Sequence, residues 1–205
     1  MPDSVRLAIG TLTRIPVPAP RRIDRRIAGR AMLLAPLVGL LLALLVAIPA
    51  QVIVNVTPAG GLLIGAMAVA ALAWLTRALH LDGLADTADA LGSGRPAPEA
   101  LAIARKSDIG PFGVVTVLFV VLIQVLALAD LLDRGAGAGS LVVAVVTGRL
   151  AITLACVRGV PAARPDGLGA VVAGSVPRRW AVVAGLVWLG LRQARTVDIA
   201  QIASA

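Results

Sequence analysis

Four long runs of apolar residues constrain this sequence more than any other feature. They cover about 31–54, 60–79, 111–132 and 140–157, and each comes close to the roughly 20 apolar residues that a helix needs to cross a bilayer. A fifth run, 180–191, is short for a span. Only 15% of the residues are charged, against about 25% in a soluble domain, and lipid cannot satisfy the backbone of an open strand. The sequence therefore predicts an all-α fold: one integral membrane domain, built as a polytopic transmembrane bundle of about five helices.

The basic residues predict how this bundle is oriented. Arginines are frequent before the first run and in the loops 80–110 and 158–179, whereas the two turns between these loops carry little charge. By the positive-inside rule, the N-terminus and both loops, including an acidic helical loop, lie in the cytoplasm. The net charge of +8 does not indicate nucleic-acid binding, because the arginines gather at the ends of apolar runs. The single cysteine, Cys156, excludes an internal disulfide.

Acidic residues concentrate after the second run. Five of the eleven fall between Asp82 and Asp108, and in the string HLDGLADTADALG (80–92) Asp82, Asp86 and Asp89 are spaced to share one face of a helix. Three carboxylates on one face repel one another unless a cation lies among them, and Mg²⁺ or Mn²⁺ binds through carboxylates together with substrate phosphates. The alternative is a solvated helix face. Acids at the mouth of an apolar run are costly and usually functional, so a metal site is favoured.

The same string resembles the signature of the cobalamin synthase family, the adenosylcobinamide-GDP ribazoletransferases. Three further segments resemble that family in the same order: TLTRIPVP (11–18), SDIGPFG (107–113) and PAARPDGLG (161–169). The resemblance covers residues 5–179 and implies an inner-membrane enzyme of coenzyme B12 assembly. Such an enzyme joins adenosylcobinamide-GDP to α-ribazole, or to α-ribazole 5′-phosphate, and releases GMP in a Mg²⁺-dependent reaction. These two substrates and the lipid bilayer are the expected partners; oligomerisation is left open.

Nine residues form the predicted site. The catalytic candidates are Asp82, Asp86 and Asp89, as metal ligands, and His80, as general base or phosphate ligand; an interfacial histidine that caps a span is the alternative for His80. The candidates for binding substrate or phosphate are Arg14, Lys106, Asp108, Arg149 and Arg164. Arg149 lies inside an apolar run, where an arginine needs an anionic partner. Arg14 and Arg164 also fit the simpler role of positive-inside charges.

Three departures from the family pattern accompany the resemblance. Leu81 occupies a position where many relatives carry an acid, and the charges of Lys106 and Asp108 are exchanged relative to many relatives. The exchanged pair is either a salt bridge that tolerates reversal or a sign of a different metal shell. Residues 192–205 do not match the family's Gly-Asp-x-x-Gly ending, which predicts a divergent or truncated tail and reduced activity.

Two other functions compete with the enzyme hypothesis. A small ion or metal transporter would show repeated halves and broken helices near the midplane, and neither is evident in the sequence. An alcohol phosphotransferase that uses CDP-linked lipids would carry an arginine after Ala85, where this chain has Asp86. The corrinoid transferase is therefore the favoured prediction.

Overall fold

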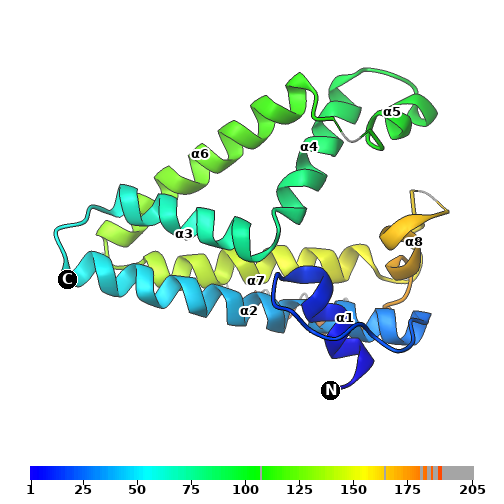
Figure 1. Cartoon of the computed structure of the whole chain (residues 1–205), viewed down its shortest axis with the longest axis horizontal. Helices are drawn as coiled ribbons and strands as arrows, with labels where there is room; N and C mark the ends of the chain where they lie inside the picture. Colours follow the sequence, from blue (N-terminus) through cyan, green and yellow to red (C-terminus); the bar gives the residue numbers. More distant parts are fainter. Residues whose placement is uncertain (107, 164, 181, 184–185, 187–188, 191–205) are drawn as a thin grey trace. The chain divides into compact units, whose positions relative to one another are not determined.

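The computed structural model describes residues 1–106, 108–163, 165–180, 182, 183, 186, 189 and 190 (Figure 1). Its contacts divide the chain into two compact units. The terminal unit joins Met1–Ala47 to Ala138–Ala205, and the central unit is Ile48–Gly137. Each unit is described by itself below.

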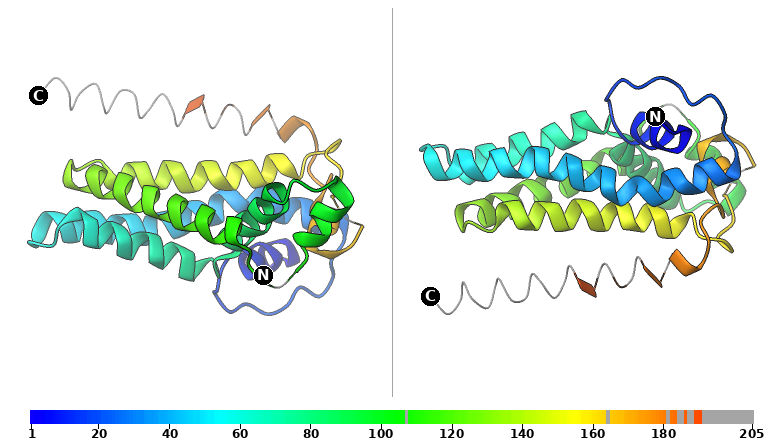
Figure 2. Two further views of the ribbon diagram at one scale, coloured as in Figure 1. Left: turned by 90° about the horizontal axis from the view of Figure 1, so that it is seen from above. Right: turned by 90° about the horizontal axis from the view of Figure 1, so that it is seen from below.

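In its described residues, the terminal unit contains two long helices and two short ones. They are α1 (Asp3–Leu12), most of α2 (Arg25–Val56), α7 (Gly137–Ala155) and α8 (Gly167–Val172). Figures 1 and 2 show α7 beside α2, with α1 against the beginning of α2.

Small residues allow close packing in the terminal unit. Ala28, Ala31 and Ala35 of α2 have no exposed surface, and the Thr153 hydroxyl of α7 donates a 2.7 Å hydrogen bond to the carbonyl of Met32. Helices in membranes associate through such close approaches and interhelical hydrogen bonds, because lipid supplies no hydrophobic driving force between them. The small residues of α2 therefore let neighbouring elements of this unit approach its backbone closely.

The central unit is built around one helix. It comprises the end of α2, then α3 (Gly61–Leu75), α4 (Leu79–Gly92), α5 (Ala97–Ile103) and α6 (Pro111–Asp133). α6 packs against both α3 and α4. In Figure 1 it runs back from the α4–α5 end to the beginning of α3.

Two glycines bring α3 close to α6. A Cβ added at Gly61 would lie 2.5 Å from the Ala129 carbonyl oxygen, and one at Gly65 would lie 3.2 Å from the Ala129 nitrogen. This spacing of small residues is typical of contacts between membrane helices. The Asp133 carboxylate also accepts a 2.9 Å hydrogen bond from the Gly61 N–H, so the end of α6 caps the start of α3.

The all-α prediction is confirmed, and the part of the chain that the structure describes contains three candidate spans, or four if one bent pair is counted. α2, α6 and α7 are long and apolar enough to cross a membrane, and α3 with α4 would add a fourth span as a bent pair. Large apolar side chains of α6 are exposed, among them Leu118 and Ile123 at 61% each, as expected for a lipid-facing helix. The predicted run 60–79 is not one helix, because α3 ends at Leu75. Half of the predicted run 180–191 lies outside the described residues, so this run stays a prediction, as does the single domain.

Candidate active site

A sharp bend separates apolar α3 from acidic α4. The Arg77 N–H donates to the carbonyl of Trp74 at 3.2 Å and the Ala78 N–H donates to that of Ala73 at 2.7 Å, the hydrogen-bond pair of a Schellman motif. Arg77 and Ala78 have φ values of 56° and 53°, a left-handed conformation that is unfavourable for residues with a Cβ. The helices on either side meet at 89°. The chain therefore leaves the apolar helix and starts the acidic one in a new direction.

Beside this bend, four of the predicted site residues line one cavity. Asp82 and Asp86 come from successive turns of α4, and Lys106 and Asp108 come from the segment that leads into α6. The cavity has a volume of about 580 Å³, and its remaining lining residues are Ala78, Leu81, Ala85, Ile109 and Val117. Three carboxylates and one ammonium leave its lining with a formal charge of −2. Such a site favours a cation, or an anion that arrives together with one.

Asp89, the third acid of the predicted face, has a different position. Its Oδ2 accepts a 2.7 Å hydrogen bond from the Gly110 N–H and its Oδ1 accepts a 2.9 Å bond from the Gly113 N–H. Gly110 is the N-cap of α6 and Gly113 lies in its first turn, where backbone N–H groups lack partners within the helix. Gly110 offers no side-chain cap of its own. Asp89 therefore caps α6 from α4 and fixes the two helices that form the cavity.

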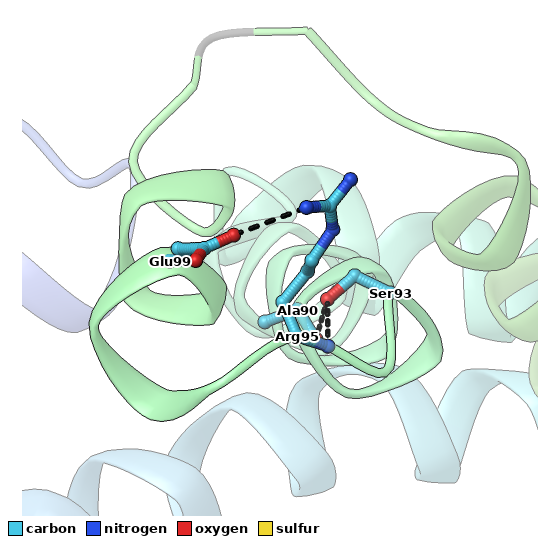
Figure 3. A network of polar contacts seen from close by, with 4 residues as sticks. All are labelled: Ala90, Ser93, Arg95 and Glu99. Atoms are coloured by element: carbon cyan, nitrogen blue, oxygen red, sulfur yellow. Dashed lines mark hydrogen bonds and ion pairs between the residues drawn. The ribbon is translucent and has the colours of Figure 1, made fainter.

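The fifth acid of the cluster, Glu99, is used outside the cavity. Its carboxylate pairs with Arg95 Nη1 at 3.2 Å, across one turn at the start of α5 (Figure 3). The Arg95 N–H donates to Ser93 Oγ, and that hydroxyl donates to the Ala90 carbonyl at 2.6 Å (Figure 3). These bonds stabilise the turn between α4 and α5.

The lining of this cavity does not include the other predicted site residues. His80 is exposed on the first turn of α4, and Arg14 is exposed in the terminal unit. Arg149 of α7 is only 4% exposed, and its buried Nε has no hydrogen-bond partner in the described part of the chain. Gly39 makes room for it, since a Cβ there would lie 2.5 Å from Arg149 Cγ. Arg164 lies outside the described residues.

The donor set of the cavity can be compared with what Mg²⁺ requires. Among the described residues, no three His, Cys, Asp or Glu side chains are placed to hold a metal ion by themselves. Mg²⁺ is usually held by only one or two carboxylates, with substrate phosphates and waters as its other ligands. Asp82 and Asp86 fit that pattern, whereas both oxygens of Asp89 already accept backbone hydrogen bonds. The donors fit an ion that is completed by a bound phosphate.

Sequence reasoning missed two features of this site. Neither Arg77 nor Ala78 is a glycine, so nothing local marked the bend, and the capping of α6 by Asp89 depends on a contact across 21 residues. Leu81 lines the cavity at the position where the family pattern often has an acid. The sequence did contain a signal for the cap. A proline at the first position of α6 marks a helix start, and two nearby glycines leave space for a carboxylate from another helix.

Comparison with known proteins adds independent support for the identity of the chain. The model of the family described as cobalamin-5-phosphate synthase matches residues 4–204, including the tail that the sequence set apart. A relative from Frankia casuarinae is 51% identical over 188 residues, and this alignment covers 88% of this chain and 68% of the relative's length. One from Nocardioides sp. is 48% identical, covering 91% and 80%, and one from Syntrophobacter fumaroxidans is 39% identical, covering 84% and 68%. Each is named adenosylcobinamide-GDP ribazoletransferase. No solved structure matches.

The motifs that carried the resemblance agree with this result. The acidic string forms α4, and the segment before α6 supplies Lys106 and Asp108 to the same cavity. Because the family model spans nearly the whole chain and relatives near 50% identity cover most of it, the chain belongs to the cobalamin-5-phosphate synthase family, a family of transferases in cobalamin biosynthesis.

Proposed function

We propose that the chain transfers the adenosylcobinamide phosphoryl group from adenosylcobinamide-GDP to α-ribazole or α-ribazole 5′-phosphate, with Mg²⁺ bound at Asp82 and Asp86. The observation that carries the proposal is the cavity in which these two carboxylates lie with Lys106 and Asp108, in a member of this family. When bound, the ion would neutralise charge on the diphosphate of the substrate.

The reaction balances as a single displacement. A ribazole hydroxyl oxygen forms a bond to the phosphorus attached to cobinamide, and the bond from that phosphorus to the bridging oxygen breaks. GMP leaves with the bridging oxygen. The hydroxyl proton passes to a base, for which His80 on the first turn of α4 is the candidate.

The residues of the cavity have separate tasks in this scheme. Asp82 and Asp86 would hold the cation, and Lys106, which lines the same cavity, would contribute a positive charge to the phosphate oxygens. Asp89 acts as a positioning residue, because it fixes the start of α6 against α4 and hence the segment that carries Lys106 and Asp108. Phosphoryl transfer depends mainly on such positioning and charge neutralisation. Arg14, Arg149 and Arg164 remain predicted phosphate ligands.

The test is GMP release by purified membranes supplied with adenosylcobinamide-GDP, α-ribazole and Mg²⁺. We expect Asp82→Asn and Asp86→Asn each to lower turnover at least a hundredfold, about 2.7 kcal/mol of transition-state stabilisation. Glu99→Gln is the matched control, since Glu99 is an exposed acid of the same unit that pairs with Arg95 and does not line the cavity. The control should keep full turnover. Near-normal GMP release by both aspartate variants at limiting Mg²⁺ would contradict the assignment.

A further inference from the structure

A second, larger cavity lies within the terminal unit. Its volume is about 1160 Å³, and it lies between the start of α2, the segment after α7 and the segment after α8. Five arginines line it: Arg25, Arg26, Arg30, Arg158 and Arg179. Its described lining includes no carboxylate. None of these five arginines was among the predicted site residues.

The walls of this basic cavity are fixed by the fold. The Arg158 N–H donates to the Val176 carbonyl at 2.9 Å and the Val176 N–H donates to that of Cys156 at 3.0 Å, forming a single parallel bridge. Val176 has no exposed surface. A Cβ at Gly29 of α2 would lie 2.5 Å from the Ser175 carbonyl oxygen, so only glycine permits this approach. Figures 1 and 2 show the chain after α7 folding back beside the start of α2.

Some of the arginines build the wall and others are available. Arg25 Nη2 donates a 2.9 Å hydrogen bond to the Ala173 carbonyl, so its guanidinium helps to hold the wall together. Arg26, Arg30 and Arg179 are exposed, and no hydrogen bond or ion pair within the described part of the chain occupies their side chains. Ser175 also lines the cavity, and its buried hydroxyl has no hydrogen-bond partner among the described residues.

This arrangement favours a bound anion. A positive-inside signal requires basic residues near the end of a span, but it does not require them to face one shared cavity, where like charges raise the energy. Guanidinium groups bind phosphate oxygens in bidentate fashion and are the common choice for phosphate recognition. Inorganic phosphate alone is small for a cavity of this size, whereas a diphosphate or a phosphodiester headgroup with its substituents fills more of it.

We propose that the cavity lined by Arg26, Arg30 and Arg179 is a binding site for a phosphate-bearing anion. Two sources share this chemistry, a soluble diphosphate and the headgroup of an anionic lipid. The residues that line this cavity belong to the terminal unit, whereas the carboxylates proposed to bind the metal belong to the central unit.

The first arm of the test uses a soluble probe. The full chain in zwitterionic phosphatidylcholine nanodiscs is titrated with inorganic pyrophosphate in metal-free buffer, and binding is followed by calorimetry. If the source is soluble, one saturable site is expected, with affinity that falls as salt is raised and falls at least tenfold in the Arg26→Gln/Arg30→Gln double variant. Arg95→Gln is the matched control, because Arg95 is an exposed arginine paired with Glu99 outside this cavity (Figure 3).

The second arm uses a lipid probe. Nanodiscs that contain phosphatidylglycerol are analysed by native mass spectrometry, and the number of phosphatidylglycerol molecules retained by each variant is counted. Retention that drops by one in the double variant and in Arg179→Gln, but not in Arg95→Gln, assigns the site to a lipid headgroup. If neither pyrophosphate binding nor lipid retention differs between the wild type and these cavity variants, the cavity is not a phosphate site. Metal-free conditions and a binding readout keep this result separate from the GMP assay.

Discussion

Replacement of Asp89 by alanine should destabilise the protein more than replacement of Asp82, an acid that lines the cavity. The change removes both hydrogen bonds to the first turn of α6, from the N–H groups of Gly110 and Gly113, and the N-cap residue Gly110 has no side chain to replace them. A hydrogen bond to a charged group contributes about 1.5–3 kcal/mol, and a lost helix cap costs about 0.5–2 kcal/mol. Because Asp89 is only partly buried and water can solvate the freed N–H groups, we expect a loss of about 3 kcal/mol, below the sum of two full bonds.

Thermal unfolding in detergent, followed with a thiol- or fluorescence-based probe, measures this loss. For a chain of this length, about 3 kcal/mol corresponds to a decrease in Tm of about 6–12 °C. Asp82→Ala is the matched control, because Asp82 is an exposed acid on the same helix. The Tm of this variant should differ from that of the wild type by about 2 °C or less. Equal shifts for Asp89→Ala and Asp82→Ala would refute the capping role. GMP release per folded molecule should fall in both variants, but only Asp89→Ala should lose activity together with stability.

Three further predictions follow from packing, burial and charge. Gly61→Ala should lower the unfolding free energy by about 1–3 kcal/mol, because its Cβ would meet the backbone of α6, whereas Gly60→Ala should change little, since nothing lies within 4 Å of that position; denaturant titration compares the two. Burial raises the pKa of the Cys156 thiol, so N-ethylmaleimide should label it more slowly than a free thiol at pH 8, faster as the pH rises and fully only after unfolding. In a Cys156→Ser background, impermeant thiol reagents should label the Ser93→Cys variant from the cytoplasmic side and the Asn55→Cys variant from the opposite side. The reverse result would overturn the orientation predicted from the arginines.

Local patterns in the sequence predicted the helices well. The run 111–132 corresponds to α6 (Pro111–Asp133), and the acidic string forms α4, as the spacing of its three aspartates predicted. These features succeeded because apolar run length and helical periodicity are properties of neighbouring residues. One cavity brings together four of the predicted site residues, namely Asp82, Asp86, Lys106 and Asp108. Their roles stay predictions.

Features that depend on distant residues could not be predicted in the same way. The spacing of Asp82, Asp86 and Asp89 suggested one shared cation, yet both oxygens of Asp89 bind N–H groups more than 20 residues away. The basic cavity depends on a bridge between Val157 and Val176. In the sequence, each of its arginines fits the pattern of an ordinary positive-inside charge. Long-range pairing decides these cases, and a single sequence read by itself carries no direct signal of it.

The bend after α3 also leaves α3 by itself short for a membrane span. At 1.5 Å per residue, the 15 residues of α3 extend about 22 Å, less than the roughly 30 Å hydrocarbon layer of a typical bilayer. A bilayer accommodates a short segment by thinning around it, at a cost that grows with each ångström of mismatch. Lipids with shorter acyl chains would relieve that mismatch and leave the first turn of α4 nearer to water. Acyl-chain length would thereby control how easily water-soluble ligands reach Asp82 and Asp86.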